Sequence, residues 1–410
     1  MTRPRSTRIS AALLALVLAS AACGDDDEAA PEESSAPEES SATEETSAPA
    51  ATSAPEATEP PATDAPDGGA ADLADVCPSP LVIQTDWFAE AEHGGLYEMI
   101  GEGYTVDVDN KVVSGPMVAG GQPTGIDLEV RSGGPAIGFA APRAQIYTDS
   151  SIHIAYSNID AQALAWADTP LIAIMAPLET NPQIIMWDPD TYPDIETVED
   201  LGEAGVIVNI FGGFGFADVF VAQGIWSAEQ VDPSYDGSPA RFIESRDIAQ
   251  QGFASAEPYN YEFVFEEYGK RPSFQLLADA GYPIYSQTLS VLPENVEAMA
   301  PCWEAFIPIA QQAAIDYVNA PDRANAIIID AVEQFDTFWV YDQGLADYSV
   351  ATQLELGLVG NGPDGTLGNI DEARVETVLE LMRTAGADVP DDLVGADMFT
   401  NEFIDETIGL

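Results

Sequence analysis

Basic residues are scarce in this sequence of 410 residues. Lys and Arg together number 13 against 70 Asp and Glu, which gives a formal net charge of −57. A surface this acidic repels nucleic acid and anionic lipid headgroups, so we expect neither as a partner. The excess of acid fits two explanations, adaptation to high salt or an ordinary secreted protein with a low pI.

Residues for catalysis and metal binding are also scarce. The chain has two histidines, His93 and His153, and two lysines, Lys111 and Lys270. It has no H-x-x-x-H or C-x-x-C spacing of zinc sites and no G-x-S-x-G of hydrolases. The sequence therefore predicts no enzyme, no catalytic residue, no metal and no cofactor.

Long apolar runs are missing as well. The run from Ile9 to Ala19 follows three arginines but is far shorter than the roughly 20 residues of a membrane-spanning helix. Small residues then lead from Ser20 to Cys23, which predicts a signal peptide over residues 1–22. The segment resembles a bacterial lipoprotein signal, in which the cysteine becomes the lipidated first residue, although Ser20 stands where Leu is commonest. An ordinary signal peptide is the alternative.

Residues 23–72 predict a disordered acidic linker. After Cys23 this stretch contains no Lys, Arg or aromatic residue and is dominated by Glu, Asp, Ser, Ala, Pro and Thr. Such a composition cannot bury enough apolar surface to offset chain entropy. We expect a spacer that holds the folded part away from the membrane.

Only three cysteines occur, so two remain if Cys23 carries lipid. In an exported chain Cys77 and Cys302 predict one disulfide between the start of the folded part and its body. Two buried free thiols are the alternative.

From Leu81 onward, apolar runs of strand length alternate with helical patterns, which predicts an α/β fold. We expect helices over 92–102, 160–167, 307–318, 323–335 and 372–385, and strands that include 81–83, 104–113, 152–156 and 206–210. The first lobe is predicted over 77–180 plus 290–410 and the second over 190–283. Two crossing strands would join the lobes as a hinge with a cleft between them.

Several segments resemble the thiamine-pyrimidine branch of the solute-binding proteins of ABC importers, which are related to nitrate, sulfonate and taurine binders. They are Gln84 to Trp87 with Glu92 to Tyr97, then Val130 to Pro135, Ile154 to Asn158, Thr197 to Leu201, and Gln251 to Tyr259. The resemblance covers about 80–390. It implies a type II periplasmic-binding-protein-like fold with two lobes.

Ligands of open α/β sheets bind beyond the carboxyl ends of strands, where several polar and aromatic residues of this chain fall. An aminopyrimidine needs a carboxylate to contact its ring nitrogens and amine, and aromatic faces for stacking. The candidate ligand-binding residues are Asp86, Trp87, His93, Tyr97, Ser157, Asn158, Gly212, Gly213, Phe214, Glu257 and Tyr259.

Each candidate has a structural alternative. In these alternatives Asp86 would cap the next turn, Trp87 would pack in the core, and His93 would form a hydrogen bond with the backbone at the start of a helix. Gly212 and Gly213 serve either to permit a positive φ or to offer backbone N–H groups to a polar ligand. His153 is expected as a half-buried strand residue.

These observations predict a monomeric, lipid-anchored protein on the extracytoplasmic face of the cell membrane, which captures an aminopyrimidine-like molecule for an ABC permease. The alternatives are a binder of a sulfonate- or nitrate-type anion, an adhesion or sensor protein, and an enzyme related to pyrimidine synthases. The last requires a lysine for Schiff-base chemistry.

Overall fold

The computed structural model describes residues 72–410 except Phe214. The predicted signal peptide, the lipidation site Cys23 and the linker up to residue 71 lie outside the described residues. The helices that are described include none long and apolar enough to span a bilayer.

Lobe 1 is built on a sheet of seven strands in the order β2-β3-β4-β1-β5-β12-β6. β1 is parallel to both β4 and β5, whereas β12 runs antiparallel to its neighbours β5 and β6. The strands are β1 (Leu81–Gln84), β2 (Thr105–Asp107), β3 (Val112–Ala119), β4 (Gln122–Arg131), β5 (Ile154–Ser157), β6 (Ile172–Met175) and β12 (Thr288–Val291).

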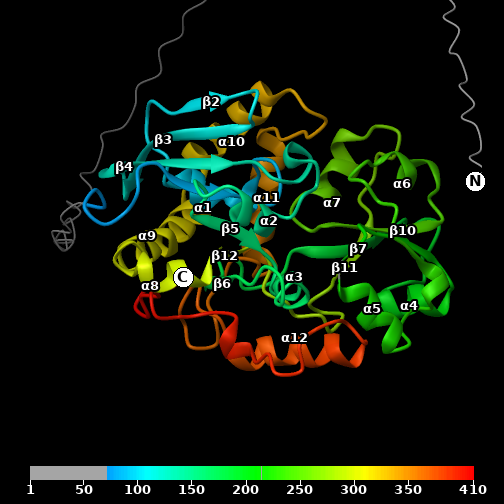
Figure 1. Cartoon of the computed structure of the whole chain (residues 1–410). Coiled ribbons are helices and arrows are strands. Elements are labelled where there is room, and N and C mark those ends of the chain that lie inside the picture. The colour runs from blue at the N-terminus through cyan, green and yellow to red at the C-terminus, as the bar shows by residue number, and fades with distance from the viewer. Residues whose placement is uncertain (1–71, 214) are drawn as a thin grey trace, which may run out of the picture. The chain divides into compact units, whose positions relative to one another are not determined.

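Lobe 2 is built on a sheet of five strands in the order β11-β7-β10-β8-β9. β10 is parallel to β8 and antiparallel to β7. The strands are β7 (Gln183–Trp187), β8 (Ile207–Asn209), β9 (Val231–Asp232), β10 (Ile248–Phe253) and β11 (Ser273–Leu276). The prediction of two α/β lobes is confirmed (Figure 1).

Helices pack against both sheets, and their apolar faces build the cores. Those that follow the strands of lobe 1 are α1 (Gly94–Glu98), α2 (Pro142–Thr148), α3 (Ile159–Leu164), α8 (Pro293–Ala298), α9 (Ala300–Asn319), α10 (Asp322–Phe335), α11 (Gln343–Glu355) and α12 (Glu372–Thr384). Those within lobe 2 are α4 (Val198–Glu203), α5 (Gly215–Ala222), α6 (Ala240–Glu244) and α7 (Glu257–Tyr259).

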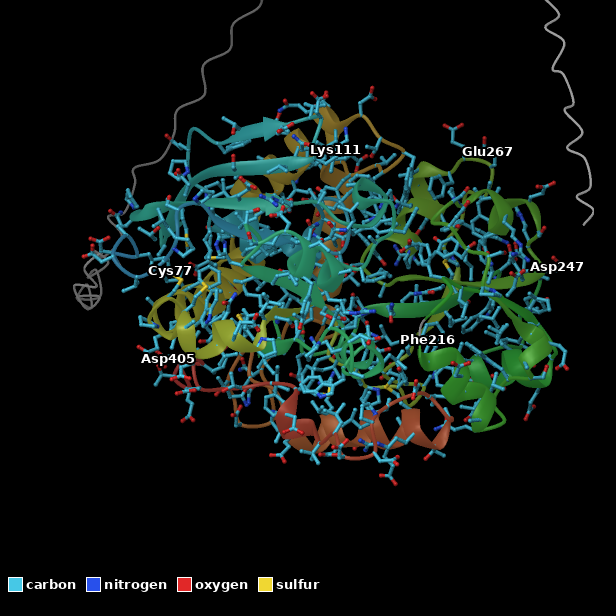
Figure 2. The ribbon with its side chains drawn as sticks, in the orientation of Figure 1. Cys77, Lys111, Phe216, Asp247, Glu267 and Asp405 are labelled. Carbon is cyan, nitrogen blue, oxygen red and sulfur yellow. A yellow bond between two sulfur atoms is a disulfide. The ribbon has the colours of Figure 1, made fainter. Side chains whose placement is uncertain are left out.

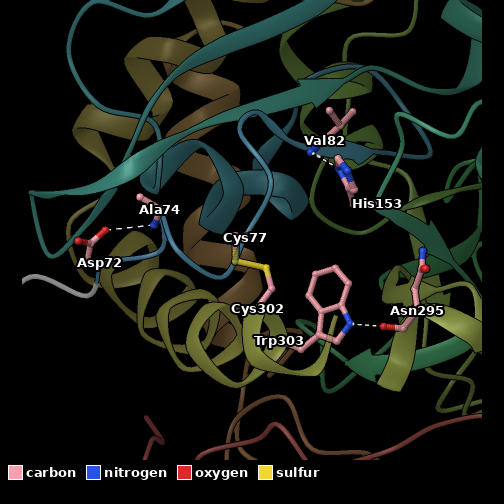
Figure 3. The surroundings of a disulfide bond; sticks show 8 residues. All are labelled: Asp72, Ala74, Cys77, Val82, His153, Asn295, Cys302 and Trp303. Atoms are coloured by element: carbon pink, nitrogen blue, oxygen red, sulfur yellow. Dashed lines mark hydrogen bonds between the residues drawn. A yellow bond between two sulfur atoms is a disulfide. The ribbon is translucent and has the colours of Figure 1, made fainter. Parts of the chain in front are cut away.

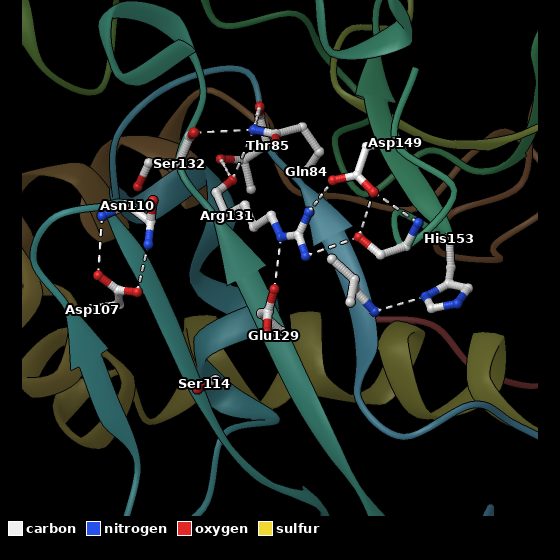
Figure 4. Close-up of polar contacts among 12 residues, drawn as sticks. Gln84, Thr85, Asp107, Asn110, Ser114, Glu129, Arg131, Ser132, Asp149 and His153 are labelled. Carbon is white, nitrogen blue, oxygen red and sulfur yellow. Dashed lines mark hydrogen bonds and ion pairs between the residues drawn. The ribbon is translucent and has the colours of Figure 1, made fainter. Parts of the chain in front are cut away.

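Two predicted elements differ near the start of lobe 1. The helix expected over 92–102 is a 3-10 turn over Ala91–His93 followed by α1, which ends at Glu98. Gly103, with a φ of 85°, then turns the chain toward β2. The strand expected over 104–113 is two strands, β2 and β3. The side chain of Asp107 accepts hydrogen bonds from Asn110 and turns the chain between them (Figure 4).

The chain passes between the sheets twice, and one arginine joins both crossings. The first crossing is residues 176–182, between β6 and β7, and the second is residues 277–287, between β11 and β12. Arg374 donates to the carbonyl of Glu179 in the first crossing at 2.8 Å. It also donates to the carbonyls of Pro283 and Ile284 in the second, at 2.6 and 2.9 Å.

Arg374 belongs to α12, which contacts α3 of lobe 1 and α5 of lobe 2. Figure 1 shows α12 running below both lobes. Its buried residues Val375, Val378 and Met382 share one apolar cluster with Phe216 of α5. The segment that the sequence assigned wholly to lobe 1 therefore also packs against lobe 2.

Cys77 and Cys302 form a disulfide with a sequence separation of 225 residues (Figure 3). Cys302 lies in the first turn of α9 and is fully buried, and Cys77 is 8% exposed. Next to it, Trp303 donates from its indole nitrogen to the carbonyl of Asn295 at 2.9 Å. The bridge ties the first described residues to the core of lobe 1.

Replacing both cysteines by serine is expected to lower the free energy of unfolding by about 2–5 kcal/mol, because a long loop is no longer closed in the unfolded chain. Guanidinium unfolding curves of wild type and the double variant measure this difference. Dithiothreitol should shift the wild-type curve and leave that of the variant unchanged. Equal midpoints for the two proteins would contradict the stabilising role of the bridge.

Candidate functional site

A cavity of about 360 Å³ lies between the two lobes. Residues of lobe 1, lobe 2 and the second crossing all contribute to its walls. Its polar and aromatic lining comprises Asp86, Trp87, Glu90, Phe139, Arg143, Tyr156, Ser157, Asn158, Asp160, Gln183, Phe211, Tyr235, Gln251, Phe253, Glu257, Gln287 and Trp339. A cavity of this volume is within the range of small-molecule sites.

The loop after β1 carries Asp86 and Trp87 into the cavity and is fixed by buried polar contacts. The amide of Gln84 donates to the carbonyls of Thr85 and Ser132, and the hydroxyl of Thr85 donates to the carbonyl of Trp87 at 2.9 Å. Figure 4 shows Gln84, Thr85 and Ser132 together beside β1 and β4. Because the donors belong to a strand and its first loop residue, the position of Trp87 is set by the sheet.

Trp87 contacts aromatic rings from both lobes. Its ring centroid lies 6.2 Å from those of Phe139 and Trp339 in lobe 1 and 6.2 Å from that of Phe211 in lobe 2. A Cβ atom on Gly134 would come within 2.4 Å of the indole, so only glycine allows this approach. Trp87 therefore joins the lobes at one end of the cavity.

Gln287 positions the carboxylate of Asp86 from the second crossing. Its amide nitrogen lies 3.2 and 3.1 Å from the two oxygens of Asp86, and its backbone N–H donates to Asn158 at 2.9 Å. Gln287 has a φ of 54°, a left-handed conformation that is uncommon outside glycine. Phe139, another cavity residue, has a φ of 60°. Such backbone is held in place by its surroundings and concentrates at functional sites.

His93 lies behind Asp86. Its Nε2 atom is 3.0 Å from Asp86 and 3.6 Å from Glu90, and its side chain is fully buried. Asp86, Glu90 and His93 offer ligand atoms within 4.8 Å of one another, the spacing of a possible metal site. A hydrogen bond between the imidazole of His93 and Asp86, with Glu90 close by, accounts for the same arrangement.

Glu257 belongs to lobe 2 and follows β10. One oxygen accepts from the backbone N–H of Phe253 at 2.6 Å. Burial raises the pKa of Glu257 to about 7, the Phe253 N–H opposes that rise, and the charge of Glu92 adds to it. The pKa of Glu90 is also raised well above its usual value, mainly by burial and then by the charges of Glu92, Asp86 and Glu257.

Seven of the predicted ligand-binding residues line the cavity: Asp86, Trp87, Ser157, Asn158, Gly212, Gly213 and Glu257. Phe214 lies outside the described residues. Three others do not line it. His93 is covered by Asp86, and Tyr97 points into the core of lobe 1 because α1 packs on α9 and α10. Tyr259 stacks on Phe263 and on Tyr348 of α11.

The basic residues are mostly placed away from the cavity. Arg131 pairs with Glu129 and Asp149 on the outer part of lobe 1 (Figure 4). Lys111 donates to the carbonyl of Phe335, and Lys270 pairs with Asp188 and Asp190. Figure 2 shows Lys111 on lobe 1 near β3. Among the described residues only Arg143 brings a basic side chain to the cavity wall.

Several residues that line the cavity were not predicted from the sequence. Phe139, Tyr235 and Trp339 lie in loops that no strand end marks, and Gln287 reaches the site through its position in the second crossing. Glu90 could have been found, because it lies between the candidates Asp86 and His93. His153 accepts from the backbone N–H of Val82 at 3.0 Å, which fits a half-buried structural residue (Figure 3).

Glu257→Gln tests the burial of this carboxyl. Because the folded protein holds the proton of Glu257 more tightly than the unfolded chain does, this group's contribution to stability falls as pH rises from 4.5 to about 7. Glutamine does not titrate. The free energy of unfolding of the variant, measured relative to that of wild type, should therefore increase by about 1–3 kcal/mol when the pH is raised from 5 to 8. Urea unfolding at both pH values measures the gain, and a difference independent of pH would contradict it.

Comparison with known proteins gives structural matches alone. No protein-family model matches the sequence, and no curated protein matches it. A protein of Bordetella bronchiseptica matches with a TM-score of 0.51 and 14% identity over 80% of this chain and 96% of its own. The ligand-binding component of an ABC-type import system from Staphylococcus aureus, solved with zinc bound, matches with a TM-score of 0.50 and 12% identity over 78% and 97%. At this identity the matches establish the fold, which is periplasmic-binding-protein-like as predicted.

Proposed function

We propose that this protein is the extracytoplasmic solute-binding component of an ABC importer. The observation that carries the proposal is the cavity itself, which lies between two lobes and is lined by residues of both. A guest that contacts both lobes stabilises the closed form, and a permease can recognise that form. The likeness to the Staphylococcus aureus import component supports this function.

The guest that we propose is a small heteroaromatic molecule of the aminopyrimidine type. Rings of both lobes offer stacking faces, with Trp87 in lobe 1 and Phe211 and Tyr235 in lobe 2. Asp86 and Glu257 offer carboxylates to an exocyclic amine and to ring N–H groups. For a sulfonate or nitrate the cavity wall offers one arginine, Arg143, among a larger number of carboxyl groups. The lining therefore favours the aminopyrimidine over an anion.

Export and anchoring complete the proposal. The signal peptide and Cys23 would place the protein on the outer face of the membrane, and the acidic linker would give the lobes reach toward the permease. The alternative of a pyrimidine-synthase-like enzyme finds little support, because Lys111 and Lys270 are both engaged outside the cavity.

Trp87→Ala tests the site. Thermal unfolding is followed in the presence of 4-amino-5-hydroxymethyl-2-methylpyrimidine, taurine or nitrate, each titrated to saturation. A ligand that binds only the folded state raises the melting temperature. We expect the aminopyrimidine to raise it for wild type and not for Trp87→Ala. The free energy of unfolding of the variant should fall by less than the ~3–5 kcal/mol that truncation of a fully buried aromatic residue costs, since Trp87 is partly exposed.

Phe263→Ala is the matched control, because Phe263 is 60% exposed and does not line the cavity. It should keep the full shift. An unchanged shift in Trp87→Ala would remove the indole from the site, and a shift produced by taurine or nitrate alone would favour the anion binder.

A further inference from the structure

The cavity contains more acid than its own residues neutralise. Four carboxyl side chains line it, Asp86, Glu90, Asp160 and Glu257, against the one guanidinium of Arg143. Glu90 is 7% exposed and Asp160 1% exposed. In the part of the chain that the structure describes, no lysine or arginine forms an ion pair with any of the four.

These four carboxyls differ in how far the protein satisfies them. Asp160 accepts from the hydroxyl of Tyr282 at 2.8 Å and from the N–H of Ala161 at 2.7 Å, so it has a structural partner set. The carboxyl of Glu257 accepts from the backbone N–H groups of Phe253 and of Glu257 itself. Glu90 has the amide of Gln287 as a hydrogen-bond partner, while the imidazole of His93 lies 3.6 Å away, beyond hydrogen-bond distance. Because a carboxylate offers about four acceptor positions, both side chains can still accept from a guest.

A further acceptor lies beside them. Gln287 is 1% exposed and lines the cavity, and its amide oxygen has no hydrogen-bond partner. Its amide nitrogen is already turned to Asp86. A buried acceptor without a donor is unfavourable, so a guest whose N–H group reaches this oxygen is favoured.

Aromatic rings line the same cavity. The rings of Phe211 and Tyr235 lie 4.6 Å apart, and Trp87 lies 6.2 Å from Phe211. Aromatic faces attract cations, the more so when water is excluded, and indole does so best. The carboxyls and the ring faces of this cavity both favour a positively charged guest.

From this arrangement we propose that the guest is bound as an organic cation with a planar head of N–H donors, of the amidinium, guanidinium or protonated aminopyrimidine class. The head faces Asp86, Glu90 and Glu257, and the body of the guest lies among the rings. This inference rests on the proposed function and adds the charge of the guest to it.

Three compounds with the same ring test the charge directly. Benzamidine is a planar cation, benzamide is its neutral isostere, and benzenesulfonate is an anion. Isothermal titration calorimetry is carried out on the full mature chain after unfolding, dialysis and refolding, which removes any guest that was carried over. We expect benzamidine to bind at least tenfold more tightly than benzamide, and benzenesulfonate to give no binding.

Single neutralising substitutions assign the charge to its residues. Glu90→Gln and Glu257→Gln keep the shape of each side chain and remove a carboxyl that can ionise against a bound cation. Each should weaken the binding of benzamidine at least fivefold and leave the binding of benzamide within a factor of two. Glu266→Gln removes an exposed charge outside the cavity and should change neither. Circular dichroism confirms that each variant is folded before it is titrated.

The outcomes separate this inference from the proposed function. If benzamide and benzamidine bind with equal affinity, and neither binds to Trp87→Ala, the solute-binding cavity stands and the proposal of a cationic guest is overturned. Tighter binding of benzenesulfonate would overturn it as well. Zinc chloride that binds through Asp86, Glu90 and His93 while benzamidine does not would make the occupant a metal ion. Failure of all three compounds and of the aminopyrimidine to bind would overturn both proposals.

Discussion

The site depends on the two crossings of the chain between the sheets. They bring the ends of β1 and β5 in lobe 1 to face the ends of β8 and β10 in lobe 2, and the cavity occupies the space between. Arg374 joins the crossings through three backbone carbonyls, and its guanidinium lies 3.7 Å from the ring centroid of Tyr285 in the second crossing. Gln287 is the last residue of that crossing, and its amide group contacts the carboxylate of Asp86.

The lobes also meet beyond the cavity, in contacts that a closed form needs. The hydroxyl of Ser255 in lobe 2 donates to Glu92 in lobe 1, and Tyr348 of α11 donates to the carbonyl of Ala254. On the opposite side α12 packs against α5. Opening of the lobes would expose Glu92 and Glu257 to water, where both carboxyls ionise more readily, so closure and the charge state of the cavity are linked.

Strand ends were the part of the site that the sequence could predict. Asp86, Ser157 and Gly212 lie at or just after the ends of strands that apolar runs predict, and ligands bind beyond the carboxyl ends of such strands. Glu257 was predicted from its place in a loop before Pro258. His93 and Tyr97 do not line the cavity, and the sequence pattern predicts a helix in this region without giving which of its faces meets α9. Trp339 and Tyr235 come from loops whose path only tertiary packing decides.

The same distinction holds for the fold. Alternating strand and helix patterns predicted two α/β lobes, but the hairpin of β2 and β3 needed the turn at Asp107 and Asn110, and the contact of α12 with lobe 2 leaves no local pattern. The sequence resemblance supplied the architecture, while the excess of acid at the cavity became visible only when carboxyls far apart in the chain, such as Asp86 and Glu257, were brought together.

The central claim is that one guest contacts both lobes at the same time. Hydrogen exchange followed by mass spectrometry, with and without saturating benzamidine, tests it most directly. The account predicts slower exchange of backbone amides in two segments at once, residues 86–93 of lobe 1 and residues 251–257 of lobe 2. Slower exchange in one lobe alone, or binding by calorimetry with no change in either segment, would contradict it.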